Sequence, residues 1–168
     1  MFVTLRNGES ARIRPIRPDD KPRLERGFAR LSDESIRRRF LAPKDHLSQA
    51  DLAYLTEVDG RDHVALVAVL DSAPDGLAGV GRFIRDPEHP DQAEFAIVVA
   101  DDLHGHGLGS ALAERLAAEA RARGIRRFTA TVLADNEAVR RLVSRISAGL
   151  RQGHVANGVG ELVVDLAA

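Results

Sequence analysis

A buried strand followed closely by an amphipathic helix is the feature that most constrains the fold of this chain. Residues 93–100 are almost continuously apolar, and apolar residues recur at helical spacing over residues 108–120. Such a strand needs cover on both faces, so the two elements together predict helices packed on a sheet in layers. Gly105 and Gly107 lie between the two elements and allow a tight turn.

Other segments predict further elements of the same α/β sandwich. The Asn7-Gly8 pair interrupts an alternating segment, which is a strong signal for a hairpin. Apolar residues at helical spacing predict helices, and short apolar runs predict strands. The expected helices begin at Pro18, span 33–40, follow Ser48, and cover 108–124 and 135–147; the expected strands span 64–70, 77–84, 93–100, 128–133 and 162–166. We assign no element to residues 149–160.

The size and charge of the chain favour one domain that binds neither nucleic acid nor a membrane. Its 168 residues suffice for one core, and its net charge of -1 lacks the basic excess that attracts a phosphate backbone. No apolar stretch reaches the roughly eighteen residues that a membrane span needs, and the first residues lack the apolar centre of a secretory signal. We therefore expect a cytoplasmic location. The absence of cysteine excludes disulfides and cysteine-bound zinc.

The glycine-rich turn predicts a site for an anion. Free N–H groups at a helix start, together with the helix dipole, favour phosphate by up to about 2 kcal/mol, and the side chains of His104 and His106 could add donors. Ser110 stands where a dinucleotide motif needs glycine or alanine, and no lysine follows the last glycine as a Walker motif requires. The turn alone therefore predicts an anion site without naming its ligand.

The sequence around this turn resembles the acetyl-CoA motif of the GNAT superfamily of N-acetyltransferases. The usual motif is Gln/Arg-x-x-Gly-x-Gly/Ala, and here His104, Gly107 and Gly109 occupy its fixed positions. Downstream, Asn136 stands where the family has an asparagine that bonds the pantetheine arm. Upstream phrases, among them Ile13-Arg14-Pro15 and Arg38-Arg39-Phe40, are similar to the acetyltransferase domain of bacterial Pat-type protein-lysine acetyltransferases.

The resemblance implies a fold, a cosubstrate and a set of binding residues. The fold is a mixed central sheet flanked by helices as a three-layer sandwich, with residues 1–168 as a single GNAT domain. The cosubstrate is acetyl-CoA, without a metal, and the acceptor is an amine, for which we expect a protein lysine; the protein would be a monomer or a homodimer. The residues implied in cofactor binding are Ile97, Val98, Val99, His104, Gly105, His106, Gly107, Leu108, Gly109, Ser110 and Asn136.

Acetyl transfer to an amine calls for a general base, because deprotonating a lysine of pKa about 10.4 at pH 7 costs roughly 4.6 kcal/mol. Glu94 is the candidate, since it lies in an otherwise apolar strand just before the turn, where we expect it to be partly buried. The matching glutamate is the base in Pat-type enzymes. Alternatively, Glu94 could pair with Arg82 or Arg85. Many superfamily members have a tyrosine as general acid where this chain has Val143.

Several less specific interpretations stay open. Asp101, Asp102, His104 and His106 have metal-ligand chemistry, yet they share a single turn. Residues 37–39 form an arginine run that is typical of a solvated helix face. Tyr54 is expected to pack in the core, and Asn136 could simply cap a helix. At the level of function, the alternatives are acetylation of small amines or amino acids, and an acyl-CoA-binding module without turnover.

Overall fold

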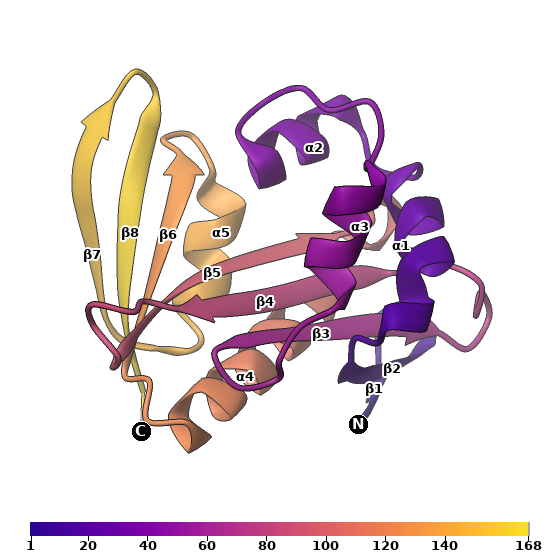
Figure 1. Ribbon diagram of the computed structural model, residues 1–168, viewed down its shortest axis with the longest axis horizontal. Coiled ribbons are helices and arrows are strands. Elements are labelled where there is room, and N and C mark those ends of the chain that lie inside the picture. Colours follow the sequence, from indigo (N-terminus) through magenta and orange to yellow (C-terminus); the bar gives the residue numbers. More distant parts are fainter. Residues whose placement is uncertain (168) are drawn as a thin grey trace.

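An eight-stranded mixed sheet organises the part of the chain that the computed structural model describes, residues 1–167. The strand order is β1-β2-β3-β4-β5-β6-β8-β7, and every neighbouring pair is antiparallel except β5 and β6. Figure 1 shows helices on both faces of this sheet, which confirms the predicted layers. No helix within residues 1–167 is both long and apolar enough to cross a membrane.

The N-terminal hairpin forms as the Asn7-Gly8 pair predicts. Strands β1 (Phe2–Thr4) and β2 (Ser10–Pro15) pair with Phe2 opposite Arg12. Gly8 has a φ of 87°, a conformation that a residue without a Cβ adopts freely. The turn therefore fixes the register of the sheet edge.

Three short helices cover one face of the sheet. A turn of 3-10 helix (Pro18–Asp20) leads into α1 (Lys21–Phe28), and α2 (Asp33–Phe40) and α3 (Gln49–Thr56) follow. The hydroxyls of the residues just before α2 and α3 accept hydrogen bonds from the first turn of each helix, which satisfies N–H groups that the helix itself leaves open. These caps explain why two eight-residue helices begin where the serines predict.

The centre of the molecule is an antiparallel meander of β3 (His63–Leu70), β4 (Gly79–Arg85) and β5 (Gln92–Val99). Its opposite face packs against α4 (Leu108–Ala122), a helix of fifteen residues. The approach is close, since a Cβ added to Gly79 would lie 2.9 Å from a methyl group of Leu112. After α4, the chain enters β6 (Arg127–Leu133), parallel to β5.

The C-terminal part differs from the prediction. Helix α5 (Glu137–Val143) is shorter than the expected helix over 135–147, and β7 (Ser147–Ala156) begins where that helix was expected to end. β7 pairs only with β8 (Val159–Leu166) and has two irregularities in its register, so neither an apolar run nor a strict alternation marks it in the sequence. The segment without an assignment, 149–160, is therefore mostly an edge strand.

Candidate active site

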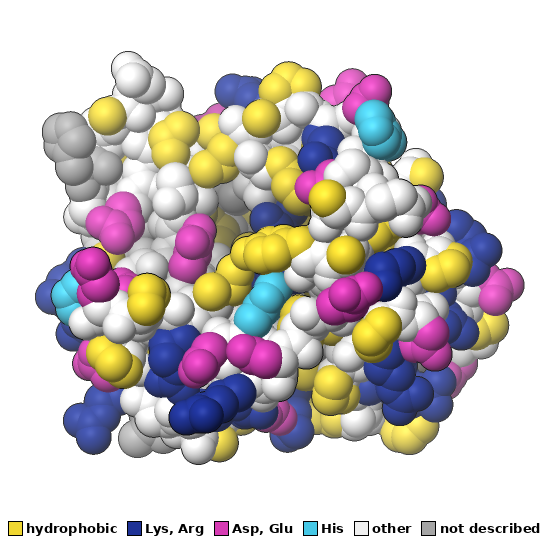
Figure 2. All heavy atoms as spheres, in the orientation of Figure 1, with side chains coloured by type: hydrophobic (Ala, Val, Ile, Leu, Met, Phe, Trp, Pro, Cys, Tyr) yellow, Lys and Arg dark blue, Asp and Glu magenta, His cyan; other side chains and the backbone are white. Residues whose placement is uncertain are grey.

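The candidate site is a cleft that opens where β5 and β6 separate. Their parallel pairing comprises only Gln92 with Arg127, Ala93 with Phe128 and Glu94 with Thr129. Beyond these pairs the two strands diverge, as Figure 1 shows. Between them lies a cleft of about 690 Å³, and Figure 2 shows the surface hollowed between the C-terminal strands and α2.

The main walls of the cleft come from the middle and C-terminal parts of the sheet and the helices beside them. β5 forms one wall and β6 with α5 the other, while the loop before α4 and one side of α2 close the ends. The lining includes the predicted cofactor residues Ile97, Val98, Val99, His104, Gly105, Gly107, Gly109, Ser110 and Asn136. The fold therefore brings most of the predicted residues together around one space.

Backbone N–H groups at the start of α4 make one end of the cleft suitable for an anion. Gly107 is the N-cap of α4 with a φ of 94°, and Gly105 has a φ of 78°. The first N–H that bonds back within the helix is that of Ala111, to the carbonyl of Gly107. The N–H groups before it in this turn have no intrahelical acceptor, and they lie at the positive end of a fifteen-residue helix. A phosphate would satisfy them.

The structure places the two histidines of the loop differently from each other. The Nε2 atom of His104 lies 2.9 Å from the carbonyl oxygen of Val99, so this ring ties the loop back to the end of β5. The carbonyl of His106 accepts a hydrogen bond from the N–H of Arg6, and its side chain is not part of the cleft lining. The side chain of Leu108 is wholly buried in the core, so only the backbone of Leu108 could reach a ligand.

Asn136 both caps α5 and lines the cleft. Its Oδ1 atom accepts a hydrogen bond of 3.3 Å from the N–H of Val139, and the residue is buried. Capping and ligand binding are thus compatible, because the cap occupies Oδ1 and the Nδ2 group could donate to a ligand carbonyl.

Glu94 lies at the closed end of the fork, where β5 and β6 still pair, and its position differs from the expectation in one respect. It is exposed, whereas we expected it to be partly buried. Its neighbours Ala93 and Phe95 point into the core, so the alternation of the strand turns Glu94 to the opposite face. The alternative ion pairs are wrong as well: Arg82 bonds to His63 and Leu55, and Arg85 bonds to Asp62.

Tyr54 is exposed on α3, with 59% of its surface accessible, so the expected core packing is wrong. Its ring centroid lies 5.3 Å from that of His63 at the start of β3. Burial, followed by the positive charge of Arg82, lowers the pKa of His63. A neutral His63 can accept a hydrogen bond at Nε2, where the Nη1 atom of Arg82 lies at 3.1 Å.

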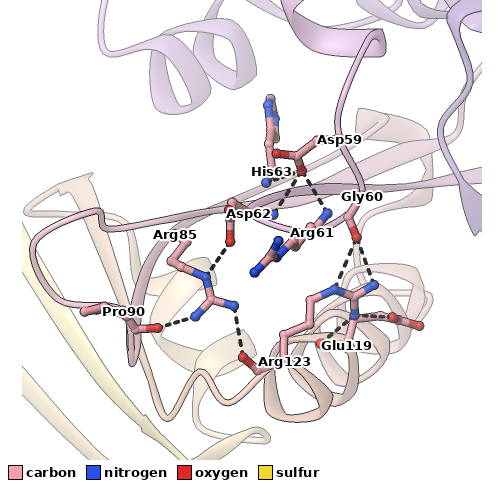
Figure 3. Close-up of polar contacts among 9 residues, drawn as sticks. All are labelled: Asp59, Gly60, Arg61, Asp62, His63, Arg85, Pro90, Glu119 and Arg123. Atoms are coloured by element: carbon pink, nitrogen blue, oxygen red, sulfur yellow. Dashed lines mark hydrogen bonds and ion pairs between the residues drawn. The ribbon is translucent and has the colours of Figure 1, made fainter.

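The loop that carries His63 is firmly held, as Figure 3 shows. One carboxylate oxygen of Asp59 accepts hydrogen bonds from the N–H groups of Arg61, Asp62 and His63, at 2.8, 2.9 and 2.9 Å. These hydrogen bonds lower the pKa of Asp59. The turn fixes the direction in which β3 begins, and with it the position of the His63 ring.

Two arginines in Figure 3 connect this loop to the rest of the domain. The Nε atom of Arg85 donates to Asp62 at 2.7 Å, and Arg123 at the end of α4 donates to the carbonyl of Gly60 at 3.0 and 3.2 Å. Arg123 also bonds to Glu119 one turn earlier. These contacts link the loop before β3 to β4 and to the end of α4 on the opposite face of the sheet.

The acidic residues of the loop before α4 have protein partners. Asp101 accepts hydrogen bonds from Ser32 and Ser35, and Asp102 pairs with Arg30 at 2.7 Å. Among the side chains that the structure describes, no group of three or more potential ligands is arranged to hold a metal ion. Through the contacts of Asp101 and Asp102, this loop holds the start of α2 beside the cleft.

Sequence reasoning missed several basic residues at the cleft. Arg6 reaches it from the N-terminal hairpin, where its Nη1 atom lies 3.4 Å from the carbonyl of Gly105. Arg141 reaches it from α5, and Arg145 from the turn that follows α5. The four-residue spacing of Arg141 and Arg145 was the only available signal. In the arginine run, Arg37 is exposed, whereas its two neighbours line the cleft.

No acid replaces the tyrosine that is absent at position 143. Val143 is fully buried, and the hydroxyl of Ser144 donates to the carbonyl of Arg141 at 2.8 Å. Protonation of a leaving thiolate would fall to another donor or to water.

Comparisons with known proteins agree with this geometry, a strand fork beside a helix that starts in a glycine-rich turn. A profile described as "Acetyltransferase (GNAT) family" matches residues 28–146. The chain belongs to this family.

Relatives with similar sequences narrow the comparison. Acetyltransferase Pat of Mycolicibacterium smegmatis is 37% identical over 146 residues, which cover 87% of this chain and 43% of that protein. An acetyltransferase of Pseudomonas aeruginosa is 33% identical over 142 residues, which cover 83% of this chain and 75% of that protein. The chain therefore spans less than half of the M. smegmatis relative.

Solved structures agree in fold. The GNAT domain of S. lividans PAT is 38% identical, with a TM-score of 0.88 over 99% of this chain and 96% of that chain. The structure of yncA from Salmonella typhimurium with its cofactor acetyl-CoA shares the fold at 20% identity, with a TM-score of 0.68 over 94% of each chain. The predicted GNAT fold is confirmed.

Proposed function

We propose that this chain transfers an acetyl group from acetyl-CoA to an amine, with a protein lysine as the acceptor. The observation that carries the proposal is the strand fork itself. It has N–H groups at the start of α4 that suit an anion, a cleft of about 690 Å³, and Glu94 at the last paired position before the two strands separate. The 37% identity to an acetyltransferase named Pat supports this choice, and so does the match to the GNAT domain of PAT.

The binding step uses groups along the whole cleft. Phosphate oxygens accept from the N–H groups at the start of α4, and arginines at the rim, such as Arg6 and Arg141, contribute positive charge. The amide of Asn136 bonds the pantetheine arm. N–H groups of Ile97, Val98 and Val99 hold the acetyl carbonyl and stabilise the oxyanion that forms on it.

The chemical step is attack of a neutral amine on the thioester carbonyl. Glu94 takes the proton of the incoming ammonium, directly or through one water, so that the nitrogen lone pair is free. The C–N bond forms, the C–S bond breaks, and CoA leaves as a thiolate that takes a proton from solvent. An exposed carboxylate suits this role, because it is open to an acceptor on the surface of another protein.

The test is turnover of acetyl-CoA by the Glu94→Gln variant with protein substrates, measured as the release of the free thiol of CoA. We expect kcat to fall by roughly 10²- to 10⁴-fold, with little change in CoA affinity. Glu88→Gln is the matched control, since Glu88 is also exposed but lies in the loop before β5, away from the point where β5 and β6 separate. Full turnover by the Glu94 variant at neutral pH would show that another group is the base.

Two other functions make different predictions. Acetylation of small amines or amino acids uses the same cleft, and a panel of free amines assayed beside protein substrates separates the two acceptor classes. The buried Val143 favours a module that binds acyl-CoA without turnover. Calorimetry would then show CoA binding while the thiol assay stays blank; measurable turnover with any amine eliminates this function. The expected cytoplasmic location remains a prediction.

A further inference from the structure

A small cavity adjoins the inner end of the cleft, and the two share walls. It has a volume of about 40 Å³ and lies between α1, α2 and β4. Its lining is largely apolar, with Leu24, Phe28 and Val80 among the residues that contribute. Val98 and Arg39 line both spaces, so a group held in the cleft along β5 has this cavity beside it.

A buried arginine in the wall of this cavity lacks a partner for one of its donors. Arg82 on β4 is only 4% exposed. Its Nη1 atom lies 3.1 Å from Nε2 of His63, and its Nη2 atom donates to the carbonyl of Leu55 at 3.1 Å. Its Nε atom is buried without any hydrogen-bond partner. Both existing partners are neutral, because the pKa of His63 is lowered, so the charge of the guanidinium is not compensated there.

A second guanidinium in the same wall adds to this charge. Arg39, which is half-buried, also lines the cavity. Within the part of the chain that the structure describes, neither Arg39 nor Arg82 forms an ion pair with a carboxylate. Burial, followed by the charge of Arg39, lowers the pKa of Arg82 to about 9. Burial likewise lowers the pKa of Arg39, which the charge of Glu94 opposes.

A buried positive charge without an ion-paired carboxylate, beside a second and half-buried one, is costly, and an anion between the two would offset the cost. A buried charge is normally paired, and an unpaired buried donor loses its hydrogen bonds to water without replacement. A planar carboxylate suits a guanidinium, which can donate from Nε and an Nη atom at once. The unpaired Nε of Arg82 is the donor that such a bond requires.

The size of the cavity limits the ligand. A site for one water needs about 10 to 15 Å³, so the cavity of about 40 Å³ has room for about three groups of that size. One carboxylate on a short carbon stem fills this space. A large acceptor side chain, or an acidic residue on a folded protein surface, would not reach a guanidinium that is 4% exposed.

We propose that this cavity holds the terminal carboxylate of a short dicarboxylic acyl group, so that the enzyme accepts malonyl- or succinyl-CoA as a donor. This inference rests on the proposed function, because the donor is bound in the same cleft. The acyl chain runs from the thioester past Val98 into the cavity, where Arg82 and Arg39 bind its carboxylate. The reaction keeps its balance: the amine nitrogen bonds to the thioester carbonyl carbon, the C–S bond breaks, Glu94 takes the proton of the amine, and CoA leaves as a thiolate.

The test compares acyl-CoA donors that carry a terminal carboxylate with donors that do not. Succinyl- and butyryl-CoA form the pair with the same number of acyl carbons. Turnover is measured with acetyl-, butyryl-, malonyl- and succinyl-CoA on one acceptor, for the wild type, Arg82→Met and Arg39→Met. We expect the wild type to use malonyl- or succinyl-CoA at least as well as butyryl-CoA. In Arg82→Met, we divide kcat/KM for malonyl- or succinyl-CoA by kcat/KM for acetyl-CoA. This ratio should fall roughly ten- to hundredfold relative to the wild type. Arg37→Met on the exposed side of α2 should leave the ratio unchanged.

The outcomes separate this inference from the proposed function. If acetyl-CoA is used but both dicarboxylic donors fail, the inference is wrong and the proposed function stands. The inference is equally wrong if Arg82→Met lowers the rates for all donors in the same proportion, since Arg82 would then have only a structural role. If no donor is turned over, calorimetry of succinyl-CoA and of butyryl-CoA still tests the inference. If succinyl-CoA binds more tightly than butyryl-CoA and Arg39→Met removes this difference, the proposed carboxylate site is supported. Equal binding of the two donors to the wild type overturns the inference.

Discussion

The carboxylate of Asp101, just after β5, accepts a hydrogen bond of 2.7 Å from the hydroxyl of Ser35 on α2. The same carboxylate accepts from the N–H and the hydroxyl of Ser32, at 2.9 and 2.8 Å. One side chain therefore ties the loop that precedes α4 to the helix on the other side of the cleft. The relative position of the anion site and of the arginines on α2 depends on it.

We predict that Asp101→Asn destabilises the protein by about 1 to 3 kcal/mol, because the amide NH₂ cannot accept the hydrogen bonds that the carboxylate oxygen accepts. Burial opposes ionisation of Asp101, but the bonds from Ser32 and Ser35 outweigh it and lower its pKa below 3.8. The contribution is therefore complete above the unfolded-state pKa and is lost as the pH falls through the lower, folded-state value. Urea unfolding at several pH values measures this.

Asp102→Asn is the matched control for that experiment. Asp102 forms an exposed ion pair with Arg30, and such pairs contribute about 0 to 1 kcal/mol. If the two variants were equally stable, the link between the loop and α2 would have no energetic weight.

A second prediction concerns the charged residue that is most completely buried. Asp20 is 0% exposed, and its two carboxylate oxygens each accept from Arg14 at 2.7 Å, while the N–H of Arg17 donates at 2.9 Å. Asp20→Asn leaves Arg14 without its counter-ion, and we expect a loss of about 3 to 5 kcal/mol in chemical denaturation. Asp19→Asn changes the exposed neighbour and should cost less than about 0.5 kcal/mol.

Local patterns predicted the elements whose burial leaves a periodic trace in the sequence. The segment from β5 to α4 was predicted because β5 is almost continuously apolar and α4 repeats its apolar residues at helical spacing. β7 was missed because it pairs on one side only and its register is twice interrupted. The hydrophobic pattern of a strand reflects which of its residues are buried, and an edge strand such as β7 has too few buried residues to show one.

The candidate site was predictable only where residues that are adjacent in the chain create it. The turn at Gly107 and the cap at Asn136 are local, so their spacing in the sequence was informative. Arg6 was missed, and Arg82 was considered only as a partner of Glu94, because the fold brings the two residues to the cleft and its cavity from distant parts of the chain. The exposure of Glu94 depends on which way its strand faces, which no local pattern determines.

A third prediction is a direct measurement on Asp51 at the start of α3. Its carboxylate pairs with Lys44 at 2.9 Å and accepts from the N–H and hydroxyl of Ser48, and these bonds lower its pKa to about 2. An NMR titration of the side chain should find that value, and Lys44→Met should raise it. Because the folded-state pKa is lowered, the stabilisation is present at neutral pH and is lost as the pH falls from about 4 through about 2.

Ser48→Ala tests the other half of this cap. Loss of the hydroxyl that accepts from the N–H of Asp51 should cost about 1 kcal/mol in unfolding free energy. A pKa for Asp51 near 3.8 in the wild type would contradict the predicted arrangement.

The last prediction concerns the turn that starts α4. Gly107 has a φ of 94°, a conformation in which a residue with a side chain is strained, although a Cβ there would meet nothing within 4 Å. Gly107→Ala should therefore move the backbone at a cost of about 1 to 2 kcal/mol, and the N–H groups of the first turn of α4 would lose their common direction. We expect CoA to bind roughly tenfold more weakly in calorimetry. Gly76→Ala, in the open turn between β3 and β4, needs no such adjustment and should bind CoA as the wild type does. Equal weakening in both variants would mean that the effect does not arise from the turn at Gly107.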